Sequence, residues 1–264
     1  MLKVLKMRSP TRAPVALLTA AALFGLWESI VRAAAVPAFV LPPPSAVVRE
    51  LAATPGVFAH AAVATIGEAL GGLVLAAIAA LGFAVVALHS RLLDRALTPL
   101  VVLSQTVPVI TLAPLLVLWL GYGALPRVVL CALVAFFPMA ITALEGLRTT
   151  DPCLLQLLRS VDASRWDVFW RVRLPQAGPF LVAGLRTGVT LSLVGAVVAE
   201  WTGGGRGLGY IVLSANSRLA VAQAFAAVLL ICLLGLAAYG LVGLGERRVG
   251  WWNRSNLDRK GIVS

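Results

Sequence analysis

Long apolar runs alternate with short clusters of charged residues along this chain. A helix needs about 20 apolar residues to cross the roughly 30 Å hydrocarbon core of a bilayer. Runs of this kind occupy residues 13–31, 60–90, 95–127, 128–144, 174–199 and 219–245. We therefore predict an all-α polytopic membrane protein with six transmembrane helices, one for each run.

The third run differs from the others because it is long and interrupted by prolines. No charged residue lies between Arg95 and Arg127. A proline inside a helix lacks a backbone N–H and clashes with the preceding turn, so we expect this span to kink or break near Pro108. The sequence Gly121-Tyr122-Gly123 then predicts a short turn before the fourth span.

Composition agrees with a membrane protein. Hydrophobic residues make up 60% of the chain, charged residues make up 12%, and the mean hydropathy is +0.94. Soluble domains average about 45–50% and about 25% for these two classes. The composition excludes a soluble enzyme, a secreted disulfide scaffold and a disordered regulator. Cys131, Cys153 and Cys232 have no metal-ligand spacing, so we expect no metal or cofactor. The two that lie in apolar runs, Cys131 and Cys232, should be small buried residues.

The net charge of +11 raises the possibility of a nucleic-acid partner, but the positions of the charges argue against it. The 22 basic residues lie mainly between apolar runs rather than on one patch. With the N-terminus inside, 17 of them fall in cytoplasmic segments and 5 in outer segments. Cytoplasmic loops carry the excess of lysine and arginine. Both termini are therefore predicted to be cytoplasmic.

This topology divides the chain into a transmembrane domain and two tails. The domain covers residues 13–248, and the cytoplasmic tails cover residues 1–12 and 249–264. The longest polar stretch, about residues 148–178, becomes a cytoplasmic loop. On the outer side, residues 40–45 lead into a short amphipathic stretch at 47–51.

Within the cytoplasmic loop, the pattern predicts two short helices, at 154–160 and 164–172, joined by a turn at Asp162-Ala163. Ser164, followed three residues later by Asp167, resembles a capping box with Asp in place of Glu. Leu174-Pro175 should end the second helix.

Trp166, Phe169 and Trp170 have the i, i+3, i+4 spacing of one helix face, flanked by arginines. Two interpretations stay open on the residues alone. The face could dock a partner, or it could be an interfacial helix whose tryptophans lie among lipid headgroups.

The segment Arg159-Ser160-Val161-Asp162-Ala163-Ser164-Arg165-Trp166, with Leu174-Pro175 downstream, resembles the coupling motif of inner-membrane subunits of ABC importers. Other stretches resemble the same family: Leu41-Pro42-Pro43-Pro44-Ser45, Ser104-Gln105-Thr106-Val107-Pro108, Leu112-Ala113-Pro114-Leu115, Trp119-Leu120-Gly121-Tyr122-Gly123, Phe136-Phe137-Pro138, Gly146-Leu147-Arg148, Glu200-Trp201 and Gly207-Leu208-Gly209-Tyr210. The resemblance covers about residues 40–248 and is to permeases of the nitrate, sulfonate and taurine type, with variants most similar to members for thiamine precursors or riboflavin.

The resemblance implies the type I ABC importer permease fold in a bacterial inner membrane. It implies a separate ATPase subunit, an extracytoplasmic substrate-binding protein and a second permease copy within the lipid bilayer. The residues that it assigns to ATPase coupling are Arg159, Ser160, Asp162, Ala163, Ser164, Arg165, Trp166, Phe169, Leu174 and Pro175.

Two positions depart from the family pattern. Gln156-Leu157-Leu158 stands where the family usually has Glu-Ala-Ala, and Asp162 stands where it usually has glycine. Aspartate can adopt the left-handed backbone region, so the second departure should be tolerated. The resemblance implies a small imported nutrient, such as a pyrimidine thiamine precursor, riboflavin or an alkanesulfonate.

Polar residues at membrane depth are costly and often line a pathway. Ser104, Gln105 and Thr106 beside Pro108 are candidates for the translocation pathway, because a broken helix frees backbone carbonyls. The alternative is hydrogen bonding between helices that only stabilises the bundle.

Four residues after the fifth span are candidates for an outer gate or a carrier contact: Glu200, Trp201, Gly207 and Gly209. An interfacial anchor is the alternative for Glu200 and Trp201. The glycines lack the preceding strand and the Lys-Ser/Thr of a phosphate-binding loop, so we expect a folded outer loop.

The sequence also bears on functions other than ATP-driven import. The chain has no GxxxxGK[ST] motif, so we expect it to be no enzyme and to depend on a partner for ATP hydrolysis. An ion-coupled secondary transporter would need inverted repeats and a buried carboxylate near mid-span. No repeat is evident, and Glu28, Glu68 and Glu200 lie toward span ends.

Overall fold

The computed structural model describes residues 12–89, 99, 109–202 and 205–249, and every regular element in those ranges is a helix. The helices are α1 (Arg12–Ala33), α2 (Pro44–Ala53), α3 (Pro55–His89), α5 (Val109–Leu120), α6 (Ala124–Arg148), α7 (Pro152–Ser160), α8 (Arg165–Val168), α9 (Leu174–Thr202), α10 (Leu208–Ser217) and α11 (Val221–Val249). A π-helical turn, Phe169–Arg173, joins α8 to α9.

Four of the described helices are long and apolar enough to cross a bilayer: α3, α6, the continuous α8–α9 helix and α11. They correspond to the second, fourth, fifth and sixth predicted runs. Helix α1 covers the first run, and the short apolar helix α5 covers the end of the third. The all-helical membrane fold is therefore confirmed. Pro108 lies outside the described residues, so the kink there and the count of six spans stay predictions.

Helices α3, α6 and α9 form the centre of the bundle, and glycines allow them to approach closely. A Cβ at Gly72 of α3 would overlap the side chain of Cys131 on α6. A Cβ at Gly184 or Gly188 of α9 would overlap Thr142 or Met139 of α6. Small residues at such positions let the helix backbones approach closely. This close packing stabilises helix association in lipid, where no hydrophobic driving force acts between helices.

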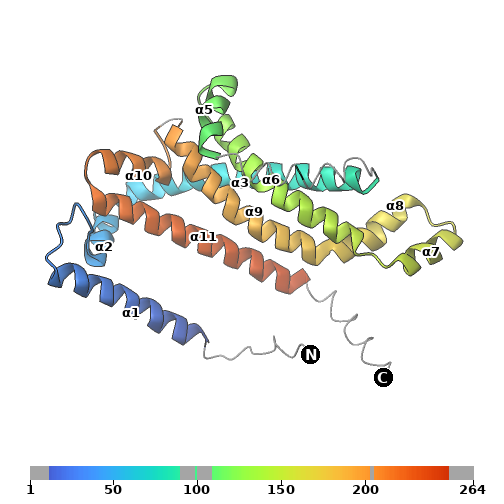
Figure 1. Ribbon diagram of the computed structural model, residues 1–264, viewed down its shortest axis with the longest axis horizontal. Helices are drawn as coiled ribbons and strands as arrows, with labels where there is room; N and C mark the ends of the chain where they lie inside the picture. The colour runs from blue at the N-terminus through green and yellow to red at the C-terminus, as the bar shows by residue number, and fades with distance from the viewer. Residues whose placement is uncertain (1–11, 90–98, 100–108, 203–204, 250–264) are drawn as a thin grey trace.

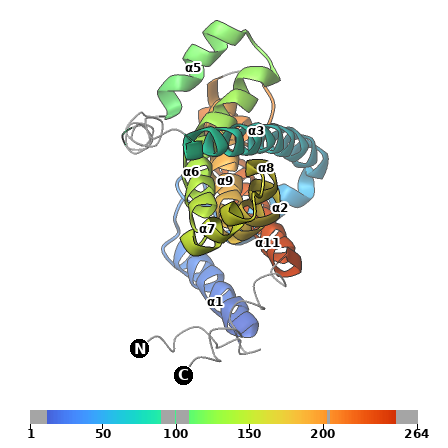
Figure 2. The ribbon, with the colours of Figure 1, turned by 90° about the vertical axis from the view of Figure 1, so that its right-hand side faces the viewer.

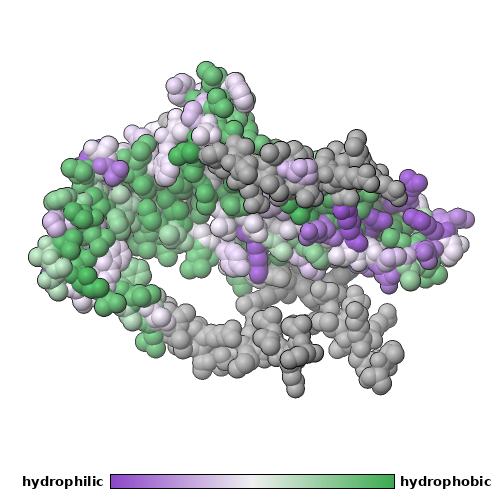
Figure 3. Space-filling view, in the orientation of Figure 1, coloured by the Kyte–Doolittle hydropathy of each residue, from purple (hydrophilic) through white to green (hydrophobic). Residues whose placement is uncertain are grey.

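The two ends of the bundle differ in character. Figure 1 shows α7 and α8 at one end and α2 and α10 at the other. Hydrophilic side chains gather over the α7–α8 end, whereas hydrophobic ones cover much of the rest of the visible surface (Figure 3). Figure 2 shows α5 at the edge of the bundle, where its Ala113 and Leu116 pack against Leu130 of α6 and Ala199 of α9. A chain with one strongly polar end matches the expectation of a polar loop outside the bilayer.

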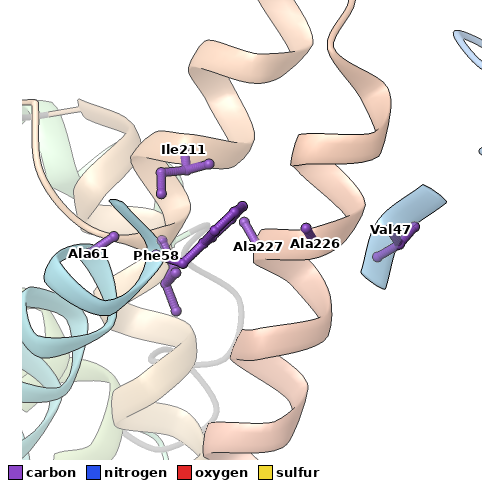
Figure 4. Close-up of a cluster of buried hydrophobic side chains, with 7 residues drawn as sticks. Val47, Phe58, Ala61, Ile211, Ala226 and Ala227 are labelled. Carbon is purple, nitrogen blue, oxygen red and sulfur yellow. The ribbon is translucent and has the colours of Figure 1, made fainter. Parts of the chain in front are cut away.

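A separate apolar core holds the α2–α10 end together. Val47 of α2 and Phe58 of α3 belong to it, with Ile211 of α10 and Ala226 and Ala227 of α11 (Figure 4). Helix α1 joins this end through a ring contact between Trp27 and Phe225, 5.8 Å between centroids. The core fixes the position of α10 against α3.

Two sequence expectations about local structure were wrong. Leu174-Pro175 does not stop the loop helix, because the π-helical turn continues directly into α9. Pro175 lies in the first turn of α9, where a proline is tolerated. The segment after Gly207 is helix α10 rather than only a folded loop.

The structure also corrects the environment of two other residues. Arg127 was counted as an outer-loop charge, yet it lies in α6 and is buried. Cys131 is buried as expected, but Cys232 is exposed on the outside of α11. Helix α11 contributes few buried residues to the bundle, so an apolar position on it need not face the core.

Candidate functional site

The hairpin formed by α7, the turn and α8 (residues 152–173, here the α7–α8 hairpin) is shaped by local hydrogen bonds. The Asp151 side chain caps α7 by accepting from the backbone N–H of Cys153 at 2.8 Å. Asp162 has a φ of 52°, which is the left-handed conformation expected where the family has glycine. The backbone N–H of Ala163 donates to the Leu158 carbonyl at 3.0 Å and closes the turn.

Ser164 caps α8 as the sequence predicted. Its hydroxyl oxygen accepts from the backbone N–H of Asp167 at 3.0 Å, and its O–H donates to the Asp167 carboxylate. The arrangement differs from a standard capping box in one respect. The Asp167 carboxylate accepts from the Ser164 hydroxyl, whereas in a standard box this side chain accepts from the backbone N–H of the cap residue. A capped start fixes the direction in which α8 leaves the turn.

The three predicted aromatic residues form one cluster along α8 and the start of the π-helical turn. Ring centroids lie 6.3 Å apart for Trp166 and Phe169, and 5.5 Å apart for Trp170 and each of the other two. Trp166 is 70% exposed, whereas Phe169 is half-buried against the core below. Phe169 therefore supports the cluster, and Trp166 presents its ring outward.

Some of the other predicted coupling residues line a cleft of about 650 Å³ under the hairpin. Its lining includes four of them: Arg159, Asp162, Ala163 and Arg165. Ser160 is exposed, and its hydroxyl donates to the Leu157 carbonyl at 2.7 Å. Leu174 and Pro175 are half-buried at the start of α9, so they form the base of the hairpin rather than its surface.

At the opposite end, Glu200 lies at the centre of a buried polar network. Its carboxylate accepts from the Thr65 hydroxyl at 2.6 Å and from the Gly209 backbone N–H at 2.6 Å. The Thr65 hydroxyl oxygen in turn accepts from the Leu208 N–H at 2.9 Å. The side chain thereby satisfies free N–H groups at the start of α10. We call Glu200, Thr65, Leu208 and Gly209 the Glu200 network.

The glycines predicted at this end lie directly on the same carboxylate. Gly207 has a φ of 101°, and a Cβ there would overlap the Glu200 carboxylate. A Cβ at Gly209 would come within 2.6 Å of the Val197 carbonyl oxygen. Glu200 is 1% exposed and Trp201 is 38% exposed. The four predicted residues therefore divide into a packed joint of Glu200, Gly207 and Gly209, and a surface residue, Trp201.

Sequence reasoning missed a buried ion pair between Glu68 of α3 and Arg127 of α6. Arg127 Nη1 donates to Glu68 Oε1, and Arg127 Nε donates to the Gly123 carbonyl at 3.0 Å. Both residues are under 10% exposed. The available signal was one acidic residue inside the second apolar run and one basic residue between the third and the fourth. An intramembrane ionisable pair of this kind is costly and is usually functional or paired for structure.

The remaining predicted site residues, Ser104, Gln105, Thr106 and Pro108, lie outside the described residues. Within the described part of the chain, no three histidine, cysteine or acidic side chains lie together as metal ligands would.

Comparison with known proteins identifies the family. The family model for the binding-protein-dependent transport system inner membrane component matches residues 72–251. A probable ABC transporter permease from Haemophilus influenzae is 35% identical, covering 84% of this chain and 91% of the relative. A riboflavin transport system permease from Chloroflexus aurantiacus is 35% identical, covering 88% of each chain.

A formylaminopyrimidine transport permease from Halalkalibacterium halodurans is 30% identical, covering 88% of this chain and 93% of the relative. These relatives are matched over nearly their whole length, as the resemblance in the sequence implied. The all-helical bundle, its polar hairpin and these matches together show that this chain belongs to the family of binding-protein-dependent ABC transport permeases of the inner membrane.

Proposed function

We propose that this permease forms the membrane pathway of an importer and is driven by a separate ATPase subunit that binds the α7–α8 hairpin. The observation that supports this most is the exposed ring of Trp166 on a hairpin whose conformation is fixed by two side-chain caps. A rigid, exposed aromatic residue is typical of interaction hot spots. An interfacial helix in lipid headgroups is the competing explanation.

The proposal includes an orientation and a set of partners. The α7–α8 end faces the cytoplasm, both termini are cytoplasmic, and the α2–α10 end faces an extracytoplasmic substrate-binding protein. Two copies of the permease enclose the pathway, with one ATPase for each copy. The absence of a phosphate-binding loop motif from this sequence supports a separate ATPase.

We further propose that the cargo is a small nutrient with a ring or a polar head. A pyrimidine thiamine precursor or riboflavin is favoured, because the resemblance is strongest to permeases of that kind and two relatives are named for formylaminopyrimidine and riboflavin. An alkanesulfonate is the alternative. Calorimetry on the cognate binding protein decides between them, and a carrier that binds only sulfonates would contradict the preferred cargo.

Docking of the ATPase is tested by Trp166→Ala with Trp119→Ala as the matched control. Both tryptophans are 70% exposed, but Trp119 lies in α5, far from the hairpin. Truncating a docked aromatic residue costs about 2 kcal/mol or more, which is about a thirtyfold loss of affinity. Trp166→Ala should lose the ATPase in co-purification, and Trp119→Ala should retain it. Equal retention by both variants would show that the hairpin is only an interfacial anchor.

A further inference from the structure

Two adjoining hollows run along α3 near the end where α10 packs. One, of about 800 Å³, lies between α3 and α10, and the other, of about 450 Å³, lies between α3 and the start of α6. Val63, Ala64 and Arg206 line both. The two hollows therefore form one continuous groove, which we call the outer groove. Each of the two hollows has a volume in the range of small-molecule sites.

The outer groove leads from the end of the bundle to the buried ion pair. Gly56 lines its first part and Glu68 its last. With a rise of 1.5 Å per residue, the separation of 12 positions between them corresponds to about 18 Å along α3. A polar solute that entered between α3 and α10 would reach Glu68 and Arg127 within the outer half of the bundle.

Arg206 lies where the two hollows meet, between two glycines. Gly205 and Gly207 on either side have φ values of 64° and 101°, and the Glu200 network fixes the chain immediately after them. The Arg206 side chain is exposed and forms no hydrogen bond or ion pair with the described residues. Its guanidinium is therefore available for a ligand.

Of the other polar groups on the walls, Arg127 can only donate hydrogen bonds, whereas His60 and Tyr210 can both donate and accept them. His60 and Tyr210 line the first part of the groove. At the inner end, Arg127 uses Nε and Nη1 for Gly123 and Glu68, and no described residue accepts from Nη2. Glu68 already holds Arg127, and its Oε2 is enclosed and receives no hydrogen bond from the described residues. Glu200 lies behind Gly207 and is occupied by the start of α10.

The rest of the groove wall is apolar, with Val57, Ala61 and Ile211 among its residues. Apolar walls with a few converging donors are typical of a small-molecule site. The donors match a carbonyl-rich ring or a small organic anion, and they offer little to a cation. A lipid acyl chain would use the walls but would leave the guanidinium of Arg206 without a partner.

We propose that the outer groove binds the cargo on its way into the membrane, and that the cargo is an acceptor-rich ring or a small organic anion whose acceptors meet Arg206. This inference rests on the proposed function as an importer and adds a place and a chemistry for the cargo. Arg206 is the residue that selects for acceptors, and Ala64 lines both parts of the groove with it.

Cysteine accessibility tests the groove directly. Ala64→Cys is made in a chain whose exposed Cys153 and Cys232 are replaced by serine, and buried Cys131 is kept. The assembled transporter in right-side-out vesicles is treated from outside with a sulfonate-bearing and a trimethylammonium-bearing methanethiosulfonate. Leu70→Cys is the matched control, because Leu70 is exposed on α3 but does not line the groove.

The expected result is reaction of Ala64→Cys but little reaction of Leu70→Cys, with the anionic reagent favoured at Ala64. Arg206→Gln should lower this anion preference by roughly twofold to fivefold, the effect of one nearby charge under screening. Arg206→Lys should retain it. Butanesulfonate and orotate should slow labelling of Ala64→Cys, whereas the cation thiamine should not.

Several outcomes would overturn the inference and leave the proposed function intact, because ATP-driven uptake is measured in the same vesicles. One is an Ala64→Cys site that reacts equally with both reagents. Another is a site that reacts only with a membrane-permeant maleimide, which would identify an acyl chain as the occupant. A third is protection by thiamine alone. Loss of ATPase binding and uptake in the parent chain would instead contradict the proposed function.

Discussion

At the scale of single residues, one carboxylate explains the arrangement of the α2–α10 end. Glu200 projects from α9 to the first N–H groups of α10, with Thr65 of α3 between them. Buried carboxylates are tolerated when hydrogen bonds satisfy them. The result is a joint between three helices that leaves no space for a side chain at Gly207.

Gly207→Ala tests this joint, with Gly205→Ala as its control. Both glycines have a positive φ, but a Cβ at Gly205 meets nothing within 4 Å, whereas one at Gly207 overlaps Glu200. Backbone strain alone costs about 1–3 kcal/mol, and Gly207→Ala must also displace the carboxylate. We expect Gly207→Ala to lower the midpoint of thermal unfolding in detergent clearly more than Gly205→Ala. Equal midpoints would mean that the Glu200 network does not hold the start of α10.

The residue scale also shows where sequence reasoning reached its limit. Cys131 was correctly expected to be a small buried residue, because it lies in an apolar run. The partners Thr65 of Glu200 and Arg127 of Glu68 were not found, since they lie 135 and 59 residues away in sequence. Only the three-dimensional packing of α3, α6 and α9 brings them together.

At the scale of elements, the α7–α8 hairpin was predicted in detail from local signals. The turn at Asp162, the Ser164 cap and the aromatic face all depend on residues within a few positions of one another, and all are present in the structure. The continuation into α9 was not predicted. A proline after a helix usually signals its end, but here the π-helical turn precedes Pro175 and shifts it into a first turn.

Asp162 provides a prediction at this scale. Because its φ is 52°, Asp162→Gly should leave the hairpin intact and change ATPase association little. Asp162→Val should weaken association strongly, since a β-branched residue is a genuine outlier at positive φ. Both variants are compared by co-purification of the ATPase subunit. If Asp162→Val bound the ATPase as well as the parent chain, the turn would have no part in docking.

At the scale of the whole molecule, the distribution of polar side chains separates two ends of one apolar bundle (Figure 3). The hydrophobic runs predicted the described long helices because a bilayer imposes both length and composition on a span. They did not predict α10, whose glycine-rich entry resembles a loop in sequence. The basic-residue count predicts an orientation for the bundle, with the α7–α8 end in the cytoplasm.

Labelling from outside intact spheroplasts tests that orientation. In the chain with Cys153 and Cys232 replaced by serine, Asn216→Cys on α10 should react with a membrane-impermeant maleimide. Ser160→Cys on α7 should react only after permeabilisation. Both positions are exposed in the structure. The reverse pattern would place the hairpin outside and would exclude a cytoplasmic ATPase as its partner.

The most direct test of the central claim is uptake by the reconstituted transporter. The permease, its ATPase and its binding protein are placed in vesicles loaded with ATP on the ATPase side, and entry of labelled cargo is measured. We predict uptake that requires the ATPase and is lost in Trp166→Ala, while membrane insertion and Trp119→Ala uptake stay normal. Uptake that persists without the ATPase would contradict the account and would indicate an ion-coupled secondary transporter.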